Sequence, residues 1–195
     1  MNFDYIFKVV VVGLKNIGKS SLVRSNHEYD HIDCMDTLGV HFQTIFQVHN
    51  NLRIQLQLWN VKMSSKFKQL YPSYLQGARG YILYFEKSDK ESFKNLNKWI
   101  KVIRNFRGSN TPIILIGHQS GLENLVNEKE IESFMKKNKL VKSYLSYNDT
   151  KNERDLIFKV LIKQIMRSID SCKTNDKVTR DPLEIQHLYD NIFQA

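Results

Sequence analysis

The stretch that decides the fold reads Val9-Val10-Val11-Val12-Gly13-Leu14-Lys15-Asn16-Ile17-Gly18-Lys19-Ser20-Ser21. Four consecutive valines without a polar break predict a strand that is covered on both faces, as in a parallel sheet. The spacing G-x-x-x-x-G-K-S that follows is typical of a loop whose backbone N–H groups surround a phosphate. A helix that begins near Lys19 would point its positive end at the same anion.

Individual residues of this loop suit different contacts with a bound anion. Lys19 can reach terminal phosphates, and the hydroxyl of Ser20 can ligate Mg²⁺. Lys15 either adds positive charge beside the phosphates or points to solvent. A chance pair of glycines in a turn is the alternative, but the full pattern between a strand and an amphipathic stretch favours a phosphate loop. We therefore expect phosphate contacts from Gly13, Lys15, Asn16, Ile17, Gly18, Lys19, Ser20 and Ser21.

The composition bounds the class of protein. The chain has 195 residues, 42% of them hydrophobic and 25% charged, which suits a single domain. No apolar run approaches the ~20 residues that span a bilayer, and residues 1–5 lack a signal-peptide pattern. Cys34 and Cys172 are the only cysteines and have no metal-ligand spacing, which favours an intracellular, reducing compartment.

The formal net charge of +9 would suit nucleic acid, an anionic membrane or an acidic partner. The chain is rich in Lys, Asn and Ile, so a biased composition is the alternative explanation. Its basic residues are spread along the sequence, and no Lys/Arg block is interleaved with aromatic residues. We therefore expect no nucleic-acid partner.

Hydrophobic patterning predicts strands that alternate with helices. Residues 40–48 and 52–59 alternate with period two around Asn50-Asn51, which indicates a β-hairpin with one buried face. Further strands are predicted at 80–85, 112–117 and 141–147, and helices at 20–27, 89–106, 127–138 and 152–169. Residues 60–66 are expected to form a loop, and residues 67–76 to mix turn and helix, with Pro72 interrupting any long helix. This order predicts an α/β fold with a mostly parallel sheet and helices on both faces.

Two parts of the chain differ in composition. Residues 1–170 carry the predicted domain, whereas residues 171–195 are a polar linker followed by a short amphipathic helix. Asp181-Pro182 would begin that helix, because proline suits the first helical position. The helix either docks on its own domain or binds a partner, and its apolar face comprises Ile185, Leu188, Tyr189 and Ile192.

From about residue 7 to residue 169, the sequence resembles the Rab branch of the Ras superfamily of small GTPases. Thr37-Leu38-Gly39-Val40-His41-Phe42 is similar to the family's T-I-G-V-D-F, and Leu56-Gln57-Leu58-Trp59 to its L-Q-I-W. Lys66-Phe67 resembles the R-F of the second switch, and Tyr74-Leu75-Gln76-Gly77-Ala78 resembles Y-Y-R-G-A. The resemblance implies the P-loop NTPase (small GTPase) fold, with a six-stranded sheet and one antiparallel edge strand.

The resemblance also implies roles for residues in the two switches. Thr37 would bind Mg²⁺ beside Ser20 and sense the γ-phosphate. Phe42, Trp59 and Tyr74 would form the aromatic triad that effector proteins contact, although simple core packing explains them equally well. The cofactor implied is Mg²⁺ with GTP or GDP, and the partners are effectors or regulators that bind the switch regions.

Several positions depart from the family in the second switch. Where the family has D-T-A-G-Q-E, this chain reads Asn60-Val61-Lys62-Met63-Ser64-Ser65. Asn60 accepts hydrogen bonds without the charge of the family's Asp, and charge-assisted bonds are the stronger class. Met63 replaces a glycine that approaches the γ-phosphate, and Ser64 is too short to orient the attacking water as the family's Gln does. We assign no catalytic residue.

The base-recognition motif also departs from the family. Where N-K-x-D is expected, the chain reads His118-Gln119-Ser120-Gly121, and the S-A-K motif is matched loosely by Asn148-Asp149-Thr150-Lys151. Losing two charge-assisted hydrogen bonds to guanine would cost about 3–6 kcal/mol, or roughly two to four orders of magnitude in affinity.

These departures leave three hypotheses. The first is a Rab-like GTP-binding protein of vesicle traffic with little or no intrinsic hydrolysis. The second is a pseudo-GTPase that serves as a protein-interaction module and binds no nucleotide, and the third is a P-loop protein that has changed its base. The C-terminal residues lack prenylation cysteines, so we expect a cytoplasmic protein that reaches endomembranes through a partner.

Overall fold

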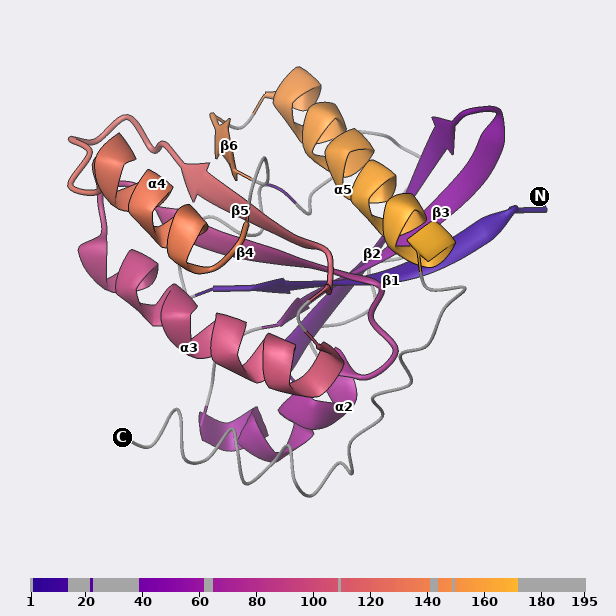
Figure 1. Cartoon of the computed structure of the whole chain (residues 1–195), viewed down its shortest axis with the longest axis horizontal. Helices are drawn as coiled ribbons and strands as arrows, with labels where there is room; N and C mark the ends of the chain where they lie inside the picture. The colour runs from indigo at the N-terminus through magenta and orange to yellow at the C-terminus, as the bar shows by residue number, and fades with distance from the viewer. Residues whose placement is uncertain are drawn as a thin grey trace.

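The core of the fold is a six-stranded sheet (Figure 1). The computed structural model describes residues 2–13, 22, 39–61, 65–108, 110–140, 144–148 and 150–171. The strands are β1 (Tyr5–Val12), β2 (Val40–His49), β3 (Leu52–Val61), β4 (Gly80–Glu86), β5 (Ile113–His118) and β6 (Tyr144–Tyr147). They lie in the order β2-β3-β1-β4-β5-β6, and every neighbouring pair is parallel except β2 with β3. The predicted sheet with one antiparallel edge strand is confirmed.

Strand β1 lies inside the sheet, between β3 and β4. Its four valines are completely inaccessible to solvent, as the uninterrupted apolar run predicted. Val10 and Val12 point into one hydrophobic core, whereas Val9 and Val11 point into a second core on the opposite face. This alternation follows from strand geometry and explains why residues 9–12 are all apolar.

The predicted hairpin is formed by β2 and β3. Asn50 and Asn51 both have positive φ, at 50° and 63°, as a two-residue type I′ turn requires. The structure corrects one boundary, because β3 continues to Val61. Asn60, predicted to begin a loop, is therefore held by strand pairing.

Three long helices follow β4, β5 and β6. They are α3 (Lys90–Arg107), α4 (Glu128–Lys137) and α5 (Lys151–Ser171). The side chain of Asp89 caps α3, and Asn127 forms a capping box with Glu130 at the start of α4. Within the described residues, no helix combines the length and apolar character that a membrane crossing requires.

The helices cover both faces of the sheet, and Figure 1 shows α3 and α5 on opposite sides of it. One core holds side chains of α3 and α4, and the other holds side chains of α5 together with Leu22. Leu22 is the one described residue of the predicted first helix, and it is helical and fully buried.

The segment between β3 and β4 contains the 3-10 helix η2 (Ser65–Leu70) and the short helix α2 (Tyr71–Leu75). Pro72 was predicted to interrupt any long helix here, and the segment consists of these two short helices, with Pro72 in the first turn of α2. That position is favourable for proline, because the first N–H groups of a helix have no partner within the helix.

Candidate functional site

Polar residues gather where the parallel strands end. Gly13 is buried directly after β1, while β4 ends at Glu86 and β5 at His118. Glu86 pairs in register with His118, and His118 with Tyr147 of β6. The carboxyl ends of parallel strands therefore meet at one edge, which is where open α/β sheets bind their ligands.

Most of the predicted phosphate loop lies outside the described residues. This holds for Lys15, Asn16, Ile17, Gly18, Lys19, Ser20 and Ser21, and also for Thr37 in the first switch and for Met63 and Ser64 in the second. Gly13 is described, and it lies directly after β1 at the carboxyl edge of the sheet. The roles of these residues remain predictions.

Asn60 is a buried polar residue at the same edge. It pairs with Val11 of β1, and its residue is 4% exposed. Strand alternation places its side chain on the face of Leu58, in the core that also holds Leu22. Its Oδ1 atom has no hydrogen-bond partner among the described residues. A buried acceptor without a partner is costly, so this position suits a donor such as a metal-bound water.

Binding of Mg²⁺ at this edge depends on the ligand atoms that the chain supplies there. Within the described part of the chain, no group of three or more His, Cys, Asp or Glu residues is placed to hold a metal ion. Mg²⁺ keeps several waters and is usually bound through substrate phosphates with one or two carboxylates. Here Asn60 offers a neutral amide in place of a carboxylate, and metal binding by Ser20 and Thr37 remains a prediction.

Glu86 binds two residues of the segment where base recognition was expected. His118 Nδ1 and Glu86 Oε2 are 2.6 Å apart, and their side chains are 8% and 12% exposed. Ser120 Oγ donates a hydrogen bond to the other carboxylate oxygen at 3.2 Å. The His118 ring also lies near the rings of Tyr84 and Tyr147. This carboxylate therefore organises the loop that follows β5.

Sequence reasoning missed Glu86, although a signal was present. It is the one acidic residue at the end of the apolar run Gly80–Glu86. A charge at the end of a buried strand requires a partner, and polar residues at the end of β5 could have supplied one.

Gly121 occupies the position of the family's guanine-binding Asp. Its φ is +82°, and a Cβ atom there would meet nothing within 4 Å. Gln119, Ser120 and Gly121 are exposed. The space for a side chain exists, but the backbone has a conformation that favours glycine.

The loop after β6 is held by Glu153 in the first turn of α5. Glu153 accepts hydrogen bonds from the backbone and side-chain nitrogens of Asn148, at 2.9 and 2.7 Å, and from the Thr150 hydroxyl at 2.8 Å. Burial alone would raise the pKa of Glu153, but these hydrogen bonds outweigh it and lower the pKa. The segment predicted to resemble S-A-K is thus fixed by a carboxylate outside that segment.

The predicted aromatic triad is brought together. Phe42 and Trp59 are register partners with ring centroids 4.4 Å apart, and Trp59 is 6.5 Å from Tyr74. Phe42 and Trp59 are half-buried, whereas Tyr74 is buried. All three contribute to the core beneath α2 and α3, so core packing accounts for part of their role.

Gly39 connects the first switch motif to the second. Its φ is +76°, and a Cβ atom there would collide with the ring of Phe67 in η2. Glycine is therefore required by both the backbone conformation and the close approach of the ring. This contact explains the Gly39 position of the motif T-L-G-V-H-F.

The order of the sheet and the G-x-x-x-x-G-K-S sequence directly after β1 are those of P-loop nucleotide-binding α/β proteins. Residues 8–167 match the Ras family, and the chain belongs to that family as a Rab-like small GTPase.

Two curated relatives illustrate the similarity. "GTP-binding protein ypt3" of Schizosaccharomyces pombe is 29% identical over 172 residues, which cover 87% of this chain and 80% of the relative. "Ras-related protein Rab-11B" of Dictyostelium discoideum is 31% identical over 179 residues, covering 89% and 80%.

Proposed function

We propose that this chain is a Rab-type GTP-binding protein of vesicle traffic that holds GTP or GDP with Mg²⁺ and hydrolyses GTP slowly. Support comes from the family match and from a relative whose name describes GTP binding. The phosphate-loop pattern at residues 13–20 follows a strand that ends at the correct edge of the sheet.

The observation that carries the proposal is the buried Oδ1 atom of Asn60, which has no partner among the described residues. The hydroxyls of Ser20 and Thr37 would ligate Mg²⁺, and Asn60 would accept a hydrogen bond from one of its waters. Bound Mg²⁺ would neutralise phosphate charge during phosphoryl transfer. The amide contributes no charge of its own, so it holds the metal less firmly than the family's carboxylate would.

Slow hydrolysis follows from the second switch. Ser64 stands where the family has the glutamine that orients the attacking water, and its side chain lacks the second methylene group and the carboxamide of that glutamine. Met63 stands where the family has a glycine close to the γ-phosphate. The chain would therefore remain in its GTP-bound state for long periods.

The alternative is a pseudo-GTPase that binds effectors without nucleotide. It is favoured by the mutual contacts of Glu86, His118 and Ser120, because these groups satisfy one another at the position of base recognition. Gly121 offers no carboxylate to guanine, so base selectivity should fall.

Released nucleotide distinguishes these functions. Freshly purified full-length chain is denatured, and the supernatant is analysed for nucleotides by chromatography. Guanine nucleotide would support the proposal, no nucleotide would support the pseudo-GTPase, and adenine nucleotide would indicate a changed base. Lys19→Ala serves as the control, and it should release nothing because the phosphate contact is lost. Single-turnover hydrolysis of bound GTP then measures the rate directly.

A further inference from the structure

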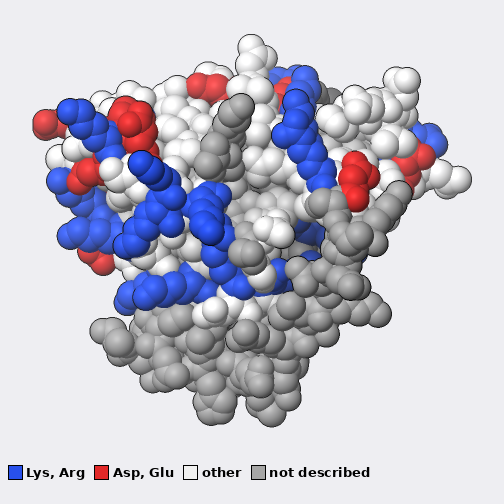
Figure 2. Space-filling view, viewed as in Figure 1, with Lys and Arg blue, Asp and Glu red and all other residues white. Residues whose placement is uncertain are grey.

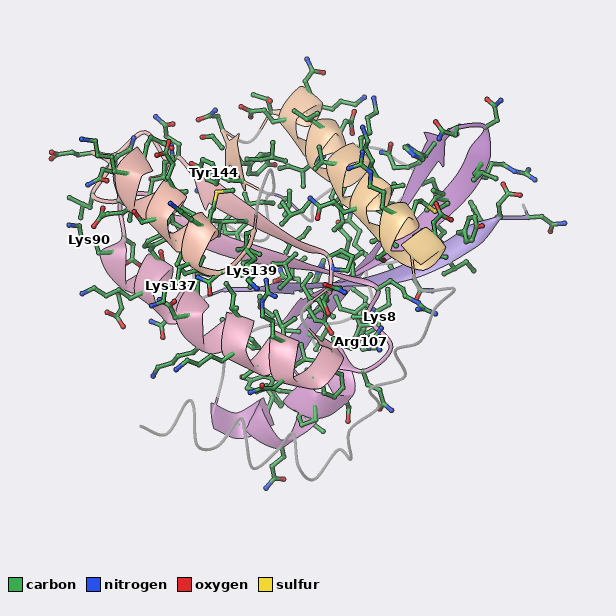
Figure 3. All side chains as sticks on the ribbon, viewed as in Figure 1. Lys8, Lys90, Arg107, Lys137, Lys139 and Tyr144 are labelled. Atoms are coloured by element: carbon green, nitrogen blue, oxygen red, sulfur yellow. The ribbon has the colours of Figure 1, made fainter. Side chains whose placement is uncertain are left out.

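Basic side chains gather over one part of the molecular surface, with acidic side chains beside them (Figure 2). These basic residues lie on α3 and at the end of α4, and Figure 3 labels Lys137 and Lys139 beside α3. The basic face, as used below, comprises Lys94, Lys98, Lys101, Arg104, Lys136, Lys137 and Lys139.

Helix geometry and helix packing bring these residues together. Lys94, Lys98 and Lys101 are spaced by four and three residues, so they share the solvent side of α3. Arg104 Nη2 donates a hydrogen bond to the carbonyl oxygen of Asn138 at 2.5 Å, which fixes the end of α4 beside α3. The basic residues that are dispersed along the sequence thus become neighbours.

Acidic residues of α3 and α4 lie near this face, and Glu132 is exposed on α4 one turn before Lys136. Glu128 binds Lys87 at 2.9 Å, and Glu130 lies 4.0 Å from Lys90, both at the beginning of α4. Glu91 accepts a hydrogen bond from the neutral amide of Asn95, which brings no compensating positive charge. Among the described residues, Lys94, Lys101 and Lys137 form no ion pair. The face therefore retains a high positive charge density.

The basic face offers little apolar surface. The exposed large apolar side chains of the described residues are Ile6, Phe46, Val48, Leu122, Leu125 and Leu156, and none of them belongs to α3 or α4. Protein interfaces usually depend on buried aromatic or apolar anchors, and single-stranded nucleic acids on aromatic stacking. Neither feature is present on the described surface of these two helices.

We propose that the basic face binds the surface of bilayers that contain anionic phospholipids. Lysine supplies six of its seven charges, and lysines are flexible point charges without the planar fork of arginine. Such charges suit a fluid, non-directional anionic surface better than a fixed phosphate or carboxylate. Several basic residues near an anionic leaflet give measurable attraction without insertion.

This inference uses described residues alone and does not depend on bound nucleotide.

Vesicle sedimentation of the full-length chain tests the proposal. The vesicles contain phosphatidylcholine alone or with about one third phosphatidylserine, to supply a negative surface potential. We expect binding only to the anionic vesicles. Raising the salt from about 0.1 M to about 1 M should abolish it, because the screening length falls from about 10 Å to about 3 Å.

Charge reversal locates the binding surface. The variant Lys94→Glu/Lys101→Glu/Lys137→Glu should lower the vesicle partition coefficient by about a hundred-fold or more. The matched control, Lys159→Glu/Lys163→Glu/Arg167→Glu, makes the same charge change on exposed residues of α5. This control should bind anionic vesicles far more tightly than the variant of the basic face does. If thermal melting shows that the glutamate variant of the basic face does not fold, the neutral variant Lys94→Gln/Lys101→Gln/Lys137→Gln takes its place.

Three results would overturn the proposal. These are failure of the wild-type chain to bind anionic vesicles at low salt, equal loss of binding in the two triple variants, and preference for an RNA duplex or an acidic protein over the vesicles. None of these measurements reports on nucleotide, so failure here is distinguishable from failure of the proposed GTP binding.

Discussion

The ammonium nitrogen of Lys8 lies 3.5 Å from the centroid of the Trp59 ring. It also donates a hydrogen bond to the carbonyl oxygen of Gln76 at 2.8 Å, at the end of α2. A cation at this distance from an indole face is attracted by the ring quadrupole. Lys8 thus connects β1 to the aromatic triad and to the segment that carries the second switch.

Stability should depend on the protonation of Lys8. Burial lowers the pKa of Lys8 from 10.5 to about 8. Between these two values the unfolded chain holds the proton and the folded chain does not, so the free energy of unfolding rises with pH. Urea unfolding at several pH values should therefore show wild-type stability increasing relative to Lys8→Met from about pH 8 to about pH 10.5.

Tryptophan fluorescence gives an independent measurement of the same contact. Loss of the Lys8 charge removes the cation from the Trp59 ring, so wild-type fluorescence should change with a midpoint near pH 8, as its pKa implies. Lys8→Met should lack this transition. A transition of equal size in the variant would mean that another group causes it.

Gly39 should tolerate no larger residue. Gly39→Ala places a Cβ atom against Phe67 and forces an L-residue to φ +76°. Gly77→Ala is a matched control, because φ there is +75° and no atom lies within 4 Å of the added Cβ. We expect a loss of about 1 kcal/mol in the free energy of unfolding for Gly77→Ala, and about 1–3 kcal/mol more for Gly39→Ala.

The Phe67 ring accounts for this expected difference. In a Phe67→Leu background, Gly39→Ala and Gly77→Ala should lower the free energy of unfolding by nearly the same amount, as measured with urea. If the excess cost of Gly39→Ala persists there, the collision with the ring is not its cause.

A charge at Asn60 should strengthen metal binding. Asn60→Asp exchanges a neutral acceptor for a charged one, and such hydrogen bonds are stronger by about 1–1.5 kcal/mol. Free Mg²⁺ slows the release of GDP from the loaded protein. The Asn60→Asp variant should therefore reach the same slow release rate as wild type at about tenfold lower free Mg²⁺. With EDTA present, the variant should be less stable than wild type, because its buried carboxylate is unpaired.

Asn60→Ala provides the opposite control, since it removes the acceptor. In this variant Mg²⁺ should slow nucleotide release less than in wild type. Identical Mg²⁺ dependence in all three proteins would place Asn60 away from the metal. The stability difference with EDTA can be measured even if the nucleotide proves to be adenine.

Local signals in the sequence predicted most of the fold. The Asn50-Asn51 turn, the Asn127 and Glu130 capping box, and the four valines each act within a few residues, so their chemistry is readable from the sequence. Contacts between distant segments were not readable. Lys8 lies 68 residues from Gln76, and Glu86 lies 32 residues from His118.

The clustering of surface charge also could not be predicted from the sequence, because it depends on contacts between distant segments. Lys94, Lys101 and Lys137 belong to two helices, and only the packing of α3 beside α4 makes them one face. The sequence also assigned the polar residue Asn60 to a loop, whereas it lies in β3. Strand pairing with Val11 outweighs that polarity, which is how a polar atom comes to be buried at the edge of the site.

The contact between Glu86 and His118 should stabilise the loop after β5. Glu86→Ala would leave His118, whose side chain is 8% exposed, without this carboxylate, and Ser120 would lose the same acceptor. Removing a charged partner from a buried group costs about 1–3 kcal/mol. Urea unfolding should show a loss of that size, and proteolysis should be faster at residues 119–125.

Glu123→Ala is the matched control, because Glu123 is an exposed glutamate in the same loop, and its loss should change stability by less than about 0.5 kcal/mol. Glu86→Gln separates charge from shape, since it keeps an oxygen acceptor but removes the negative charge. We expect the free energy of unfolding of Glu86→Gln to lie between those of Glu86→Ala and wild type. Equal stability of Glu86→Ala and Glu123→Ala would show that the carboxylate does not hold this loop, and the base-recognition segment would then be free to reorganise around a nucleotide.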